Sequence, residues 1–292
     1  MKSIIWFRND LRIDDNPSLR AACDNSYEVH AIFLYSQEQL EQHNEANVKL
    51  DFLINNLKCL SDSLEELNIP LSIIDSKGFY EDPEVILKTS KERDVGKVFF
   101  NKQFGEDEQK RDIEVTTLLN ASNVEVESFN DQIVYEAGSI RTGQDNPYSV
   151  FTPFKRKWVE NFDMEFLDIA HKYTPMNQGN ISSNVSSFNF DFTIEHKVDM
   201  SLWPAGEQAA LDRLKNFLEN KASNYSKDRN DPIIDGTSRM SPYLALGVIS
   251  SKRCILEGLK LNNFEFNSGN NGITKWIDEI VWREFYRNIM FS

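Results

Sequence analysis

The stretch SIIWFRNDLRIDDNPSLRAACDNSYEVHAIFLY, residues 3–35, decides the fold of the first half of the chain. Its two ends, SIIWF and VHAIFLY, are short apolar runs that predict buried strands. Between them, Asn16 and Pro17 form a typical helix start, because an asparagine side chain can cap a helix and proline suits its first turn. Strand, helix and strand in this order predict a right-handed βαβ unit with parallel strands.

The same alternation continues to about residue 130. Further strands are expected at 70–75, 97–101 and 124–129. The longest helix is expected at 47–67, where leucine and isoleucine recur every three or four residues. The sequence therefore predicts a Rossmann-like α/β domain over residues 1–131. No GxGxxG motif follows the first strand, so an ordinary NAD site is not expected.

The pattern changes after Asp131. Residues 132–205 hold one basic, aromatic helical segment, VFTPFKRKWVENF, followed by an asparagine- and serine-rich stretch without helical periodicity. We expect this region to be an interdomain connector that runs over the surface. Over residues 206–292 the apolar spacing is helical and no strand pattern returns. This last part is therefore predicted to be the beginning of an all-α domain.

The composition is that of a soluble globular protein, with 40% hydrophobic and 27% charged residues. No apolar run approaches the roughly 18 residues that a membrane span needs, so no membrane partner is expected. The three cysteines and four histidines are scattered, which favours neither a disulfide framework nor a metal site. We expect a cytoplasmic, metal-free protein.

The net charge of -14 is unevenly distributed along the chain. Of the 32 Lys and Arg and the 46 Asp and Glu, 12 and 11 respectively lie in residues 201–292. The first 200 residues therefore carry almost all of the negative charge, which repels nucleic acid. Any surface that binds phosphate is expected in the C-terminal part.

The loop DGTSRMSPYLALGVIS, residues 235–250, is the first segment that suggests chemistry. Ser241 and Pro242 predict a helix start with the serine as its cap. Thr237, Ser238 and Arg239 come directly before it. Hydroxyl groups, a guanidinium and free backbone N–H groups at a helix start favour a phosphate. A well-capped helix behind an exposed loop would explain the same pattern.

The segment WIDEIVWREFYRNI, residues 276–289, predicts a helix with two distinct faces. Glu279, Trp282, Arg283 and Tyr286 fall on one stripe, which suits a flat polar ligand such as a nucleobase or a flavin ring. The alternative is an aromatic stripe that packs on a neighbouring helix. Glu284 lies in the apolar arc, where we expect it to be ion-paired with an arginine and to act structurally.

Four motifs occur in order: IIWFRNDLRIDDNPSL, VFTPFKRKW, DGTSRMSPYLALGVIS and WIDEIVWREFYRNI. Together they closely resemble the photolyase/cryptochrome family, above all the class I bacterial cyclobutane pyrimidine dimer photolyases. The resemblance spans the whole chain. It implies a light-harvesting α/β domain, a long connector and an all-α domain that holds FAD. It also implies light-driven repair of cyclobutane pyrimidine dimers in UV-damaged DNA, by electron transfer from reduced FAD.

The resemblance further implies roles for the matching positions. Trp282 would stack on a dimer flipped out of the DNA helix, and Glu279 would hydrogen-bond to its base edge, which makes these two the implied catalytic pair. Arg229 and Tyr286 are implied to join them on the DNA face. The residues implied to contact FAD are Tyr225, Thr237, Ser238, Arg239, Met240, Ser241, Trp276, Glu279, Arg283 and Tyr286.

Two acids of the first domain match the antenna region of the family. Glu108 matches the acid that binds a folate, and Asp107 stands where the family pattern has asparagine. The implied antenna chromophore is methenyltetrahydrofolate.

Family members continue well past residue 292. On the resemblance, the chain is therefore expected to be a C-terminally truncated form that retains little FAD, and a monomer if completed. Two other functions stay open at this stage: a cryptochrome-like blue-light receptor, and an inert fragment in which only the antenna domain folds.

Overall fold

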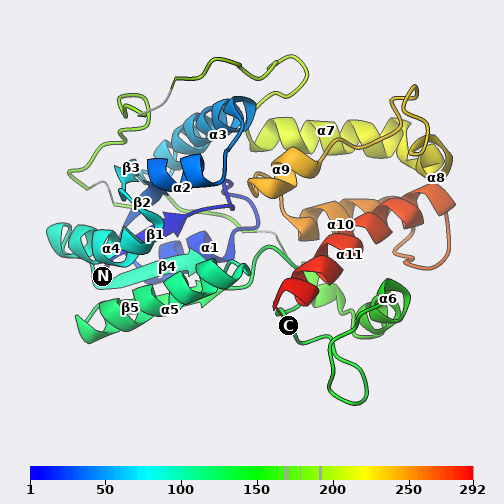
Figure 1. The fold of residues 1–292 in the computed structure, drawn as a ribbon, viewed down its shortest axis with the longest axis horizontal. Coiled ribbons are helices and arrows are strands. Elements are labelled where there is room, and N and C mark those ends of the chain that lie inside the picture. The colour runs from blue at the N-terminus through cyan, green and yellow to red at the C-terminus, as the bar shows by residue number, and fades with distance from the viewer. Residues whose placement is uncertain (168, 170, 178, 191–192, 292) are drawn as a thin grey trace.

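A parallel sheet flanked by helices and a separate group of helices make up the molecule (Figure 1). The computed structural model describes residues 1–167, 169, 171–177, 179–190 and 193–291. None of the helices in the described part of the chain combines the length and the apolar character that crossing a membrane requires.

The sheet has five parallel strands in the order β3-β2-β1-β4-β5. All five lie within one residue of the predicted ranges, so the Rossmann-like α/β prediction is confirmed. Parallel strands covered on both faces are apolar nearly throughout, which explains the continuous runs in the sequence. The strands are β1 (Lys2–Phe7), β2 (Glu28–Tyr35), β3 (Leu71–Asp75), β4 (Lys97–Asn101) and β5 (Glu125–Phe129).

Alternate side chains of β1 enter two separate apolar clusters, one on each face of the sheet. Ile4 and Trp6 pack with residues of α4 and α5, whereas Ile5 and Phe7 pack with residues of α1 and α3. At the start of α1 the Asn16 side chain accepts a hydrogen bond from a backbone N–H, as predicted. The helices of this part are α1 (Pro17–Asn25), α2 (Gln37–Gln42), α3 (Asn47–Glu65), α4 (Asp82–Glu92) and α5 (Glu106–Ala121), with a 3-10 turn η1 (Phe79–Glu81).

No strand occurs in the described residues 206–291, so the prediction of a helical last part is confirmed. Between α6 and α7 the chain runs back across the α/β layer, past α3 (Figure 1), and its backbone hydrogen-bonds to Leu67 and Leu71. The remaining elements are α6 (Phe151–Glu160), η2 (Met164–Leu167), α7 (Glu207–Asn220), η3 (Ala222–Asn224), α8 (Tyr225–Asp228), α9 (Ser241–Ala245), α10 (Ser251–Leu261) and α11 (Asn271–Phe291).

The side chain of Arg12 joins the α/β layer to the helices. It is buried, and it donates to the carboxylate of Asp131, just after β5, and to the carbonyl oxygen of Gly247, just after α9, at 3.1 Å. Gly247 has a φ of +63°, and a Cβ there would lie 2.0 Å from the carbonyl oxygen of Asn9. Only glycine therefore allows the two backbones to approach this closely.

Glu207 at the start of α7 forms a second junction between the layers. Its carboxylate accepts hydrogen bonds from the backbone N–H groups of Ile13 at 3.0 Å and Asp14 at 2.9 Å. The Asp14 side chain in turn forms an ion pair with Arg253 of α10 at 2.5 Å. The loop after β1 is therefore bound to two helices of the second layer.

Glu284 fixes α11 to the segment that follows β5. Its buried carboxylate accepts hydrogen bonds from the backbone N–H groups of Val134 at 2.9 Å and Tyr135 at 3.1 Å. The prediction of a structural acid is confirmed, but the predicted arginine partner is wrong. Residues 132–135 have left the sheet, so their N–H groups lack strand partners and the carboxylate satisfies them instead.

We predict that Arg12→Ala lowers the free energy of unfolding by about 3 kcal/mol, because Asp131 then stays buried without its partner. Urea denaturation, monitored by circular dichroism, measures this change. The control is Arg20→Ala, whose pair with Asp24 is half exposed and is expected to change stability by less than about 0.5 kcal/mol. Equal effects of the two substitutions would contradict this account of the junction.

Glu284 predicts a specific dependence of stability on pH. Burial raises the pKa of this carboxyl from 4.5 to about 7, although the two backbone hydrogen bonds partly oppose the rise. Between these values the folded protein holds a proton that the unfolded chain lacks, so stability falls as the pH rises from about 4.5 to 7. Above that range both states are ionised and the effect is constant.

Glu284→Gln removes this titration. Relative to Glu284→Gln, we expect the wild type to lose up to about 3 kcal/mol of unfolding free energy as the pH rises from 4.5 to 7. Urea denaturation at half-unit pH steps measures it, with Glu160→Gln at the exposed end of α6 as the control. A difference that does not vary with pH would show that Glu284 has an ordinary pKa.

Candidate functional site

The loop before α9 and one face of α7 enclose a hollow of about 420 Å³, which we call the cradle. Thr237, Ser238 and Arg239 line it, so the structure brings these three predicted residues together. Two further cations, Arg213 and Lys221, also line it. Three cations and three hydroxyl-bearing residues, Ser201 being the third, line one hollow, and this combination suits a phosphate group.

Asp235 forms ion pairs with two of the three cations of the cradle. Its carboxylate lies 2.6 Å from Lys221 Nζ and 2.8 Å from the guanidinium of Arg239. The hydrogen bond from Lys221 and the charges of the nearby cations lower the pKa of Asp235, so it remains ionised near neutral pH. A phosphate entering the cradle would share Lys221 and Arg239 with this carboxylate.

The start of α9 differs by one residue from the prediction. Met240 precedes the helix, Ser241 is its first residue, and no side chain caps it. Arg239 has a left-handed backbone with φ of +52°, so the chain turns before Met240 and the serine enters the helix. Because α9 has only five residues, we expect side-chain cations rather than the helix dipole to attract an anion.

Met240 and Tyr225 lie apart from the cradle. The side chain of Met240 is buried in the apolar core, so only its backbone is available to a ligand. Tyr225 is also buried, and its ring packs edge-on against Phe217 at 5.8 Å between ring centroids. Phe217 lines the cradle, so Tyr225 supports its wall from behind.

Three predicted residues form a cluster between α8 and α11. Arg229 directly follows α8, and its guanidinium forms an ion pair with the Glu279 carboxylate. The same guanidinium lies 5.7 Å from the ring centre of Tyr225. Burial, together with the charge of Glu279, raises the pKa of the Tyr225 phenol. The acid and the guanidinium implied for DNA recognition thus neutralise each other in this structure.

Trp282 contacts the rings of Phe151, Phe285 and Tyr286. Phe151, the first residue of α6, stacks on it at 3.8 Å between ring centroids with 11° between the planes. Tyr286 approaches it at 5.5 Å and 29°. Tyr286 is exposed, whereas Phe151 is buried. The predicted pair of Trp282 and Tyr286 is therefore adjacent at the surface, and Phe151 lies beneath it.

Trp276 and Arg283, both expected beside FAD, are turned into the protein. Trp276 is buried, with its ring 5.3 Å from that of Phe217. Arg283 donates to the backbone oxygens of Gln132 and Leu244, the latter at 3.2 Å. Burial lowers the pKa of Arg283 to about 10, and neighbouring Arg287 contributes. The structure does not bring these two side chains to the cradle.

The two antenna candidates differ in position. Asp107 is exposed in the first turn of α5, 4.0 Å from Lys110. The Glu108 carboxylate folds back so closely that a Cβ on Gly105 would lie 2.0 Å from it. Glu108 also lines a hollow of about 350 Å³ between the sheet and Leu246, just after α9. Of the two acids, only Glu108 faces the space between the layers.

Arg213, Lys221, Asp235 and Phe151 were not identified from the sequence. The two cations occur in the run DRLKNFLENK, which has the composition of an ordinary solvated helix face. The one available signal was the surplus of basic residues in the last part of the chain. Phe151 lies in a different predicted region from Trp282, so no spacing connects them.

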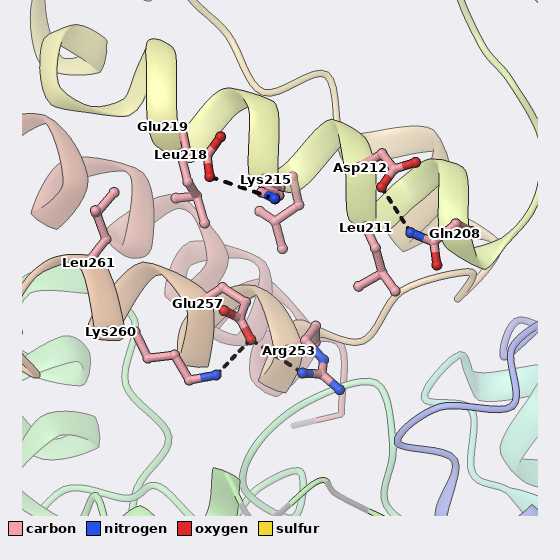
Figure 2. Close-up of a pocket in the computed structure, with 11 residues that line it drawn as sticks. Gln208, Leu211, Asp212, Lys215, Leu218, Glu219, Arg253, Glu257, Lys260 and Leu261 are labelled. Atoms are coloured by element: carbon pink, nitrogen blue, oxygen red, sulfur yellow. Dashed lines mark hydrogen bonds and ion pairs between the residues drawn. The ribbon is translucent and has the colours of Figure 1, made fainter.

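A hollow of about 650 Å³ between α7 and α10 contains none of the predicted residues (Figure 2). Leucine side chains from both helices point into it, among them Leu211 and Leu261. Its charged groups are paired along their own helices; Glu257, for example, lies 3.2 Å from Arg253 and 3.0 Å from Lys260. With its charges satisfied, this hollow carries no evident chemistry.

Residues 3–176 match the family model described as DNA photolyase. The deoxyribodipyrimidine photo-lyase of Escherichia coli K12 is 32% identical over 289 residues, which are 98% of this chain and 60% of that protein. The chain belongs to the DNA photolyase family. It spans about 60% of the length of this curated relative.

Solved structures share the fold. A class III photolyase from Agrobacterium tumefaciens aligns with a TM-score of 0.78 at 24% identity, covering 99% of this chain and 59% of that one. An archaeal photolyase from Sulfolobus tokodaii, solved with two FAD molecules, aligns with a TM-score of 0.75 at 21% identity, covering 100% and 60%. At these identities the likeness concerns the fold.

Proposed function

We propose that the protein repairs cyclobutane pyrimidine dimers in DNA by light-driven electron transfer from reduced FAD. The observation that carries this proposal is the placement of Glu279 and Trp282 on neighbouring turns of α11, beside Arg229, in a chain of the DNA photolyase family. An acid, an indole and a guanidinium at one surface supply hydrogen bonding, stacking and phosphate attraction together.

The cradle fits the phosphate end of FAD. Arg213, Lys221 and Arg239 outnumber the two acids, Asp212 and Asp235, so the lining carries a net positive charge. Thr237 and Ser238 would add hydroxyl and backbone N–H donors to the pyrophosphate. When bound, reduced FAD supplies the electron that splits the dimer. The chain's own contribution is to bind the phosphates and to fix the cofactor's orientation.

The α11 surface would receive the lesion. A dimer must leave the DNA helix to be reached, and its weakened pairing and stacking reduce the cost of flipping. Trp282 would stack on the flipped pyrimidines, and the Glu279 carboxylate would accept hydrogen bonds from their N–H groups. Arg229, which now pairs with Glu279, would turn to a DNA phosphate. The Glu279 carboxylate would then be free to bind the bases.

An antenna chromophore fits the space beside Glu108. We propose that a methenyltetrahydrofolate occupies the hollow between the sheet and Leu246, with the Glu108 carboxylate as a hydrogen-bond acceptor. Ligand sites in open parallel sheets lie at the carboxyl ends of the strands, and Phe33 to Tyr35 at the end of β2 line this hollow.

The cradle predicts a charge-dependent affinity for FAD. Arg239→Gln is expected to weaken FAD binding about tenfold, because a charge-assisted contact to phosphate is lost. Titration of the chain with FAD, followed by quenching of flavin fluorescence, measures the affinity. Lys215→Gln is the matched control, since Lys215 is a cation of α7, one face of which lines the cradle, but lies outside the cradle. Equal affinities of Arg239→Gln and wild type would rule out the cradle as the phosphate site.

The lesion surface predicts a selective loss of binding. Trp282→Ala is expected to weaken binding of an oligonucleotide with one thymine dimer about tenfold, with little effect on the undamaged oligonucleotide. Fluorescence anisotropy measures both affinities, and Tyr80→Ala, an exposed aromatic of the α/β layer, is the control. Illumination of the FAD-loaded protein with blue light tests repair itself. Tight binding of FAD without any dimer splitting would contradict repair and favour a light receptor.

A further inference from the structure

Helix α6 contacts the candidate site although it lies far from α11 in the sequence. Its Lys155 forms an ion pair with Asp278 of α11 at 2.6 Å, and both side chains are mostly buried. This pair holds the middle of α6 against the first half of α11. Phe151 therefore has a fixed position relative to the neighbouring turn of α11, which carries Trp282.

The contact between Phe151 and Trp282 is closer and flatter than most aromatic pairs. Ring centroids in aromatic pairs usually lie 4.5–7 Å apart and prefer offset or edge-on arrangements. Here the distance is 3.8 Å and the planes differ by 11°, so Phe151 covers one face of the indole. Phe151 is itself buried and packs edge-on against Phe285 at 5.9 Å. The covering ring is thus held in place by the core.

Trp282 is only partly buried, so its indole keeps exposed surface that the ring of Phe151 does not cover. Tyr286 approaches the indole at 5.5 Å and is 57% exposed. A pyrimidine that stacks on the indole must therefore approach the part of the ring that Phe151 leaves uncovered.

We propose that Phe151 is a positioning residue: it covers one face of Trp282 and presents the other face to a flipped pyrimidine. The inference rests on the proposed function, because it concerns how that lesion is received. An indole held in one rotamer loses less conformational freedom when a base stacks on it. It also admits the lesion from one side, which fixes the lesion's orientation relative to Glu279.

The test separates positioning from ordinary packing. Phe151→Met keeps most of the volume but removes the flat ring, and Phe151→Tyr keeps the ring. Phe154→Met is the matched control, because Phe154 is also buried on α6 and contacts Phe285. Its ring does not contact Trp282, whose ring contacts among the described residues are with Phe151, Phe285 and Tyr286. The probes are an oligonucleotide with one thymine dimer and the same oligonucleotide undamaged, each titrated against the full chain.

The readout is the ratio of the two dissociation constants, measured beside the melting temperature. Phe151→Met is expected to reduce this discrimination about fivefold, the scale of one aromatic stack. Phe151→Tyr is expected to restore it to within about twofold of wild type. Phe154→Met is expected to lower the melting temperature as much as Phe151→Met does while leaving the ratio unchanged.

Two outcomes would overturn the inference, and a third would affect the proposed function. If both methionine variants change the ratio in proportion to their loss of melting temperature, Phe151 is a core residue only. If Phe151→Met leaves the ratio unchanged while Trp282→Ala reduces it, Trp282 needs no positioning by Phe151. If Trp282→Ala itself leaves the ratio unchanged, the lesion surface has been wrongly assigned, and the inference fails with it.

Discussion

The packing of the α/β layer against the helices depends on the contacts of one buried side chain, the guanidinium of Arg12. Burial alone would lower its pKa, but the charge and hydrogen bond of Asp131, together with the charges of Asp15 and Asp10, outweigh burial and keep the cation charged. Its acceptors come from the loop after β1, the end of the sheet and the loop after α9. A buried charge needs all of these partners together, so the two layers fit in one arrangement. Gly247 allows the backbone contact that completes it.

The sheet could be predicted because its signals are local. Strands covered on both faces are apolar nearly throughout, and the cap at Asn16 needs only its immediate neighbours. The start of α9 could be predicted less well, because it depends on the left-handed backbone of Arg239. Arginine has no preference for that conformation, so the turn is imposed by surrounding contacts, including the pair with Asp235.

The candidate site could be predicted only in part, because a helical wheel assumes a single buried side. Helix α11 packs against α6, α8 and α10, so much of its circumference is covered (Figure 1). Glu279 and Tyr286 reach the surface as expected, whereas Trp276 and Arg283 face inward. The need of Glu284 for a partner could be predicted. Its partners could not be predicted, because no sequence pattern shows which backbone N–H groups of an irregular segment lack a partner.

The segment between β5 and α6 helps to hold the candidate site in place. Arg283 and Glu284 bind α11 to residues 132–135, and Phe151 at the start of α6 lies beneath Trp282. That segment leaves the sheet at Asp131, the same residue that holds Arg12. The position of the indole is therefore coupled to the joint between the layers through one continuous core. A domain boundary at the start of α7 would separate α11, which carries the candidate site, from the side chains that fix its position.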